Sequence, residues 1–135
     1  NPGVQKALYR KPTYHEFKHE DFLIEKTEGA AAKIILGKGS PILLQSDATL
    51  KDISIEDGHA FQHTLNQGKT LALVVISGKG MVFDIQNGTK YYINKKDFAL
   101  IHAKQKGRIS IHADSTFRLA ALEVPSQVSY PLYRN

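Results

Sequence analysis

Short apolar runs separated by turn residues fill the chain from Ala31 onward and restrict it to an all-β fold. The strongest run, Leu71–Ile76, has six apolar residues and ends at the turn Ser77–Gly80. No stretch after residue 30 shows the 3.6-residue periodicity and the caps of an amphipathic helix. The runs recur every 8–12 residues or so, which is typical of sandwiches and barrels. The others are Ala32–Leu36, Ile42–Leu44, Ala48–Ile55, Met81–Ile85, Tyr91–Ile93, Phe98–Ile101, Ile109–Ile111 and Phe117–Val124.

Two patterns predict how individual strands are buried. The unbroken run Leu71–Ile76 predicts a strand that is buried on both faces, whereas the alternation in Lys51–Ile55 predicts a strand with one face in water. Met81–Ile85 also alternates and is followed by Asn87-Gly88. That dipeptide is a strong hairpin signal because both residues tolerate positive φ.

The length of 135 residues fits one domain, and a hydrophobic content of 41% favours folding over disorder. Residues 1–28 are polar and charged, so we expect an N-terminal arm or linker there and a barrel over residues 29–135. The chain has no cysteine, which excludes disulfides and thiolate zinc sites and suits a reducing compartment. No apolar stretch reaches the roughly 20 residues of a membrane span, and the N-terminus has no signal-peptide core. We therefore expect a cytoplasmic protein with no membrane partner.

The formal net charge of +5 raises the question of nucleic-acid binding. Binding of phosphates needs cations on one continuous face. Solvated turns at one end of a barrel explain the charge without any partner, so we expect no nucleic-acid partner. The alternative is a basic interaction module, which salt-dependent DNA binding would reveal. It would act through the local cluster Lys95, Lys96, Lys104, Lys106 and Arg108.

The spacing of Gly58 and Gly78 resembles that of the two glycines in the first cupin motif, Gly-x5-His-x-His-x3–4-Glu-x6-Gly. The resemblance implies a cupin-type jelly-roll barrel, in which three histidines and one glutamate of two motifs bind a metal ion. In this chain neither a histidine nor a glutamate occupies the four corresponding positions, which fall on Thr64, Asn66, Leu71 and Gly107.

The loss of these ligands has a chemical consequence. A divalent ion needs several imidazole or carboxylate donors at about 2.0–2.2 Å. We therefore predict no catalytic residue, no metal and no other cofactor in this chain. His59 and His63 lie nearby but out of register, and a slip of one residue turns a strand side chain to the opposite face. They are the fallback metal ligands if the alignment shifts or a bulge intervenes.

A finer resemblance is to the C-terminal half of pirin-family proteins, in which the N-terminal half holds the metal. Some pirins have quercetin 2,3-dioxygenase activity, and others act as nuclear or transcriptional cofactors. The resemblance implies a structural, partner-binding or ligand-binding role beside a metal-bearing cupin half or another copy of the chain. The alternative is a part of a metal-dependent dioxygenase whose metal lies in another cupin half. The segments that carry the resemblance are Ile34–Gly37, Ser40–Leu43, Asp57-Gly58, Val75–Gly80, Ile109–Ser115 and Ala121–Pro125.

For a barrel without metal we predict that a small ligand binds at the mouth, around the positions of the lost ligands. Four side chains from the strands near those positions are the candidates: Phe61, Thr64, Asn66 and Phe83.

The segment His15–His19 matches H-E-x-x-H, the zinc-binding motif of helical metalloproteases. It lies in a polar arm without a long flanking helix, and no third ligand follows at a suitable separation. We interpret it as a charged surface segment. The tail Tyr130–Tyr133 is expected to pack on the barrel or on a partner, because tyrosine suits interfaces.

The remaining histidines, His102 and His112, are interpreted as hydrogen-bonded residues at strand edges. Asp114 could orient His112 as a base. Neither Ser110 nor Ser115 has the glycine pattern of a nucleophile elbow.

Overall fold

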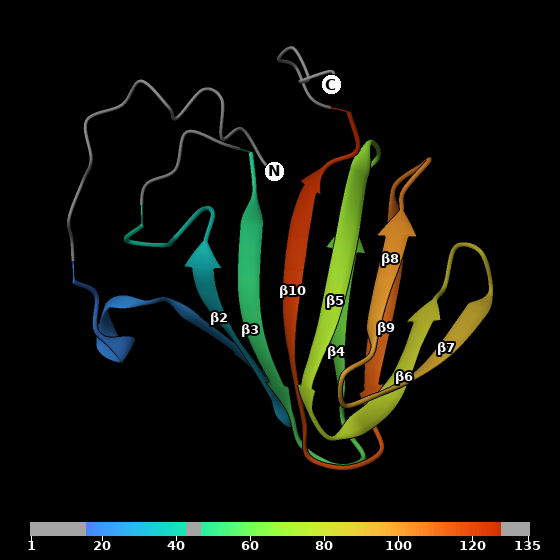
Figure 1. Cartoon of the computed structure of the whole chain (residues 1–135), viewed down its shortest axis with the longest axis horizontal. Helices are drawn as coiled ribbons and strands as arrows, with labels where there is room; N and C mark the ends of the chain where they lie inside the picture. Colours follow the sequence, from blue (N-terminus) through green and yellow to red (C-terminus); the bar gives the residue numbers. More distant parts are fainter. Residues whose placement is uncertain (1–15, 43–46, 128–135) are drawn as a thin grey trace.

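The computed structural model describes residues 16–42 and 47–127, which form two antiparallel sheets facing each other (Figure 1). The strand order is β1-β2-β3-β10-β5-β8 in the six-stranded sheet and β4-β9-β6-β7 in the four-stranded sheet. Most connections after β3 pass from one sheet to the other, as in a jelly roll. The strands are β1 (Ile24–Thr27), β2 (Ala30–Leu36), β3 (Thr49–Ile55), β4 (Ala60–Leu65), β5 (Lys69–Ser77), β6 (Lys79–Asp84), β7 (Thr89–Asn94), β8 (Phe98–His102), β9 (Gly107–Ala113) and β10 (Phe117–Pro125).

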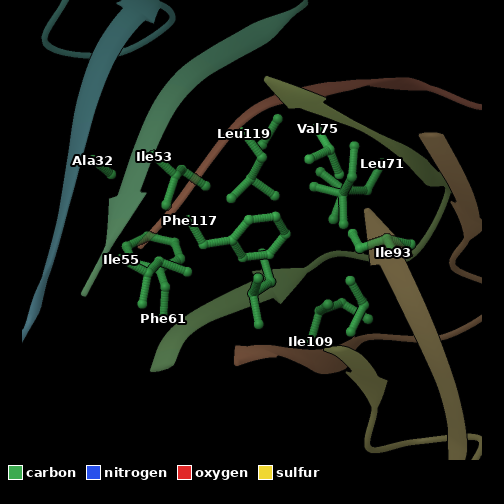
Figure 2. Packing of buried hydrophobic residues seen from close by; sticks show 14 of the residues in the cluster. Ala32, Ile53, Ile55, Phe61, Leu71, Val75, Ile93, Ile109, Phe117 and Leu119 are labelled. Carbon is green, nitrogen blue, oxygen red and sulfur yellow. The ribbon is translucent and has the colours of Figure 1, made fainter. Parts of the chain in front are cut away.

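The core lies between the two sheets and is apolar. Phe117 and Leu119 of β10 and Ile53 of β3 extend from the six-stranded sheet toward Phe61 and Ile109 of the four-stranded sheet (Figure 2). All five side chains are buried. Burial of an aliphatic or phenyl side chain of this size contributes about 1.5–3 kcal/mol to folding. The all-β prediction is confirmed.

The strand register defines one end of the barrel, which we call the mouth. Here β4 ends at Leu65 and β9 begins opposite it at Gly107. On the other sheet β5 begins at Lys69 and β8 ends at His102.

Strand β5 differs from its predicted burial. Leu71, Leu73 and Val75 face the core, but Val74 and Ile76 face outward and are exposed. The prediction of a strand buried on both faces is wrong for the single chain, because no element in the described part of the chain covers the outer face of β5. Strand β3, by contrast, ends with the predicted alternation of buried and exposed residues.

The predicted hairpin joins β6 to β7. Gly88 adopts a left-handed conformation with φ of 66°. Asn87 does not, and it contributes by donating from its side-chain amide to Oδ2 of Asp84 at 2.7 Å.

The segment expected to be an arm adds a strand to the barrel. Strand β1 pairs with β2 through contacts such as Ile24 with Lys33, so the six-stranded sheet begins before residue 29. His15 lies outside the described residues, and His19 begins the three-residue 3-10 turn η1 (His19–Asp21) instead of continuing an α-helix.

Two other predicted segments cannot be compared in full. Tyr130–Tyr133 and the second half of Ile42–Leu44 lie outside the described residues. Within the described ranges, no helix has the length and apolar character needed to cross a membrane.

Replacement of Gly80 by alanine tests the close approach of β6 to its neighbours. A Cβ atom at this position would collide with the carbonyl oxygen of His112 and lie 2.6 Å from Cε2 of Phe117. We expect Gly80→Ala to lower the free energy of unfolding in urea by about 1–3 kcal/mol. The control Ser54→Ala, at an exposed position of β3, should change it by less than about 0.5 kcal/mol. If Gly80→Ala and Ser54→Ala had the same free energy of unfolding, the close approach of β6 to His112 and Phe117 would be contradicted.

Candidate functional site

The pleat of β4 decides which of the expected site residues face the barrel interior. Phe61, His63 and Leu65 are buried, whereas Thr64 is exposed, as is Asn66 just after the strand. The register counted from the cupin motif is therefore wrong by one residue on this strand. His63 faces the interior, and Thr64 does not.

The interior positions of β5 and β9 close to the expected metal site are apolar. Leu71 and Leu73 of β5 and Ile109 and Ile111 of β9 are all buried. Within residues 16–42 and 47–127, no three His, Cys, Asp or Glu side chains come together in a way that could hold a metal ion.

His63 and Glu123 meet inside the barrel although 60 positions separate them in the sequence. Nε2 of His63 lies 2.9 Å from Oε1 of Glu123, and the two side chains are 8% and 15% exposed. An ionised carboxylate only accepts hydrogen bonds, so Nε2 carries the proton and donates it. The pair links β4 of the four-stranded sheet to β10 of the six-stranded sheet.

The strand register places this pair in one layer across the barrel. His63 is opposite Ile109, and Ile109 is opposite Asp84 of β6. In the facing sheet Glu123 is opposite Leu71. We call His63, Asp84 and Glu123 the polar layer. It lies just below the mouth, because His63 is two residues before the end of β4.

A cavity of about 300 Å³ opens at the mouth. Leu65, Ile101 and Ile109 give it an apolar lining, and Asp84 gives it a buried carboxylate. Its other polar lining residues come from the end of β8, from the β8–β9 loop and from the β6–β7 turn: His102, Lys104, Gln105, Gln86 and Asn87.

Hydrogen bonds hold two of these polar groups in place. Nδ1 of His102 lies 2.8 Å from the hydroxyl of Thr70, and that hydroxyl lies 2.7 Å from Oγ of Ser126. The carboxylate of Asp84 is held by the amide of Asn87. The carboxylate is thus oriented before any ligand binds, whereas the imidazole lies on the outer face of the sheet, because the neighbouring Ile101 takes the inward position.

The structure does not bring the four predicted ligand-binding residues together. Phe61 lies in the core, while Thr64 and Asn66 are exposed outside the barrel. Phe83 alternates with the buried Val82 and therefore faces outward, where the ammonium of Lys90 lies 5.4 Å from its ring centroid.

The fallback metal ligands also lie apart. His59 precedes β4, its side chain is 38% exposed, and its Nδ1 atom is 3.2 Å from the carbonyl oxygen of Asp57. His59 and His63 are four positions apart, which in an extended chain corresponds to about 13 Å between their Cα atoms. The two imidazoles therefore cannot bind one ion.

Sequence reasoning missed Asp84 and Glu123. A signal existed for Glu123, which is the one carboxylate within the apolar run Phe117–Val124. Ser110 and His112 of β9 are hydrogen-bonded, since the Ser110 hydroxyl lies 2.9 Å from Nε2 of His112 and accepts from the Gln62 amide at 2.8 Å.

No family model matches the sequence, and no curated protein matches it. Solved structures of cupin-type barrels do match the fold. Pac13 of Streptomyces, a nucleoside dehydratase, has a TM-score of 0.64 and 18% identity over 84% of this chain and 83% of its own. Ectoine synthase from P. lautus has a TM-score of 0.58 and 18% identity over 78% of this chain and 70% of its own.

A third structure, GK1651 from Geobacillus kaustophilus, has a TM-score of 0.67 and 17% identity over 90% of this chain but 50% of its own. The predicted cupin jelly-roll fold is confirmed by these similarities. They show the fold, and the pirin resemblance stays a prediction.

A double-mutant cycle on His63 and Glu123 tests the link between the sheets. His63→Leu or Glu123→Leu alone leaves one buried polar group without its partner, which should lower the free energy of unfolding by about 1–3 kcal/mol. The double variant should lose less than the sum of the two, with a coupling of about 1–2 kcal/mol in urea denaturation. Thr64→Ala on the outer face of β4 serves as the control. Additive losses would show that the two side chains do not interact.

Proposed function

We propose that this cupin barrel binds a small polar organic molecule in the cavity at its mouth, without a divalent metal. The observation that carries the proposal is a cavity whose apolar lining is combined with a buried carboxylate already held in place, that of Asp84. Small-molecule sites are typically concave and largely apolar, with a few oriented polar groups, and the volume of about 300 Å³ is at the lower end of their range.

The lining residues define the chemistry of the ligand. The carboxylate of Asp84 accepts hydrogen bonds from hydroxyl or amide groups, and the ammonium of Lys104 donates to a carbonyl or an anionic oxygen. Lys104 has no ion-pair partner in the described part of the chain. A nucleoside or a sugar acid carries both kinds of group. The shared fold of a nucleoside dehydratase supports a nucleoside as the first probe.

The absence of metal is proposed from the donor set. A divalent ion needs several donors that converge on one point, and the strands that would supply them place Leu71, Ile109 and Ile111 in the interior. The inward imidazole, His63, is already hydrogen-bonded to Glu123.

A second candidate follows from the pirin resemblance. In it the domain is the metal-free half of a dioxygenase, and a metal-bearing cupin half is its partner. The match to half the length of GK1651 supports the idea that a barrel of this size can be one part of a longer chain.

Metal analysis separates a metal-free site from a metal site inside this barrel. For protein purified without chelator or histidine tag, mass spectrometry should find less than about a tenth of an equivalent of iron, zinc, manganese, copper or nickel. Close to one equivalent would contradict the proposal. Loss of that metal in His63→Gln would then identify the imidazole as a ligand.

Ligand binding at the mouth can be tested with uridine and glucuronate by NMR. Binding should shift the amide resonances of Ile101, His102 and Lys104. Ala103→Trp, which fills the cavity from its lining, should weaken binding at least about tenfold. The control Thr64→Trp places the same side chain outside the barrel and should leave binding unchanged. No binding of either probe, or binding that survives Ala103→Trp, would overturn the proposal.

A further inference from the structure

The outer face of the six-stranded sheet carries an apolar patch on β5 and β8. Val74, Ile76, Phe98 and Leu100 are 49%, 42%, 67% and 55% exposed. Val74 is directly opposite Phe98, and Leu100 is opposite Ala72, so these side chains lie on neighbouring strands of one face. We call Val74, Ile76, Phe98 and Leu100 the β5–β8 patch.

The sequence pattern of β5 indicates that the outer face of this strand is covered in the functional protein. An unbroken apolar run is typical of a strand with both faces buried, and the fold buries only the face that carries Leu71, Leu73 and Val75. Single exposed apolar residues are common on protein surfaces, whereas a contiguous group of them marks an interaction site.

Unpaired lysines flank β8 at both of its ends. Lys95 and Lys96 lie in the turn before the strand, and Lys104 and Lys106 lie in the loop after it. None of the four forms an ion pair within the described ranges. The nearby carboxylate of Asp97 accepts a hydrogen bond from the backbone N–H of Asn94 within the turn, and it forms no ion pair with these lysines.

The cation on the neighbouring strand β10 is already neutralised. Arg118 of β10 donates from Nη2 to Oδ2 of Asp52 at 2.7 Å, and the hydrogen bond and charge of Asp52 raise the pKa of Arg118. The uncompensated positive charge beside the patch is therefore concentrated at the ends of β8.

Lys96 has a further property. With φ of 77° it is the one residue other than glycine in the described part of the chain with positive φ. Glycine or asparagine would adopt this conformation at lower cost. The chain thus keeps a cation in a turn position that favours a different residue.

This charge distribution argues against a second copy as the partner. A two-fold axis that aligns β8 with β8 of another copy brings lysines against lysines, whether the two strands run parallel or antiparallel. Like charges opposed across an interface suppress that pairing. Carboxylates on a different protein would instead complement both ends of the strand.

We propose that the β5–β8 patch docks a separate protein whose contact surface has an apolar centre and a rim of carboxylates. The apolar centre covers Phe98 and Leu100, and the rim pairs with the lysines at the two ends of β8. The patch lies on the outside of the sheet, whereas the proposed ligand cavity lies at the mouth. Either proposal can fail without the other.

The test uses a synthetic helical peptide with leucines on one face and glutamates on the other, and a matched peptide with lysines in place of the glutamates. Fluorescence anisotropy should show binding of the glutamate peptide, with the lysine peptide at least about tenfold weaker. Phe98→Ser combined with Leu100→Ser should abolish binding, and Lys95→Gln combined with Lys106→Gln should weaken it and reduce its dependence on salt. Ile85→Ser removes an apolar residue outside the patch that is 45% exposed, and it should have no effect. Circular dichroism checks that every variant is folded.

Several outcomes would overturn this inference. One is a concentration-dependent dimer in sedimentation that Phe98→Ser disrupts, since the occupant would then be a second copy. Another is binding to phosphatidylserine vesicles without binding to the glutamate peptide, which would make the surface a membrane contact. A third is absence of peptide binding, or peptide binding unchanged by the patch variants.

Discussion

The alternation of side chains along each strand is the constraint on which the rest of the structure depends. Because every second residue faces the core, a strand that carries one polar residue among apolar ones must place it either in water or between the sheets. On β4 this alternation buries His63 together with Phe61 and Leu65. On β6 it buries Asp84, and the neighbouring Phe83 faces outward. The polar layer is thus a direct consequence of strand register, and the cavity at the mouth lies directly above it.

A buried polar group is tolerated only with a partner. His63 has Glu123, Asp84 has Asn87, and Thr70 has both His102 and Ser126. Each of these contacts joins segments that pack against each other near the mouth. One of these hydrogen bonds, between Asn87 and Asp84, therefore also orients a group that would meet a ligand. The hydrogen bond between Asn87 and Asp84 thus serves both the stability of the fold and the proposed ligand binding.

The sequence was sufficient to predict the strands, because apolar runs and turn residues such as Asn87-Gly88 are local signals. It was not sufficient for the site. A count of residues from Gly58 placed the interior positions of β4 wrongly by one, and a slip of one residue exchanges the two faces of a strand. Glu123 could be noticed as the lone carboxylate in an apolar run, but its partner lies 60 positions away and depends on the pairing of whole strands. On the outer face of β5 the apolar pattern predicts a covered surface, and the described part of the chain provides no cover for it.

The position of β10 has a consequence for how the molecule is assembled. It is the last strand of the described chain, yet it lies between β3 and β5 in the middle of the six-stranded sheet (Figure 1). Until it is made, a nascent chain on the ribosome holds β1-β2-β3 and β5-β8 as two separate fragments with unpaired inner edges. Such edges and the apolar surface beside them are prone to aggregation. A premature stop before Phe117 should therefore produce a substrate for chaperones and proteases, not a smaller barrel.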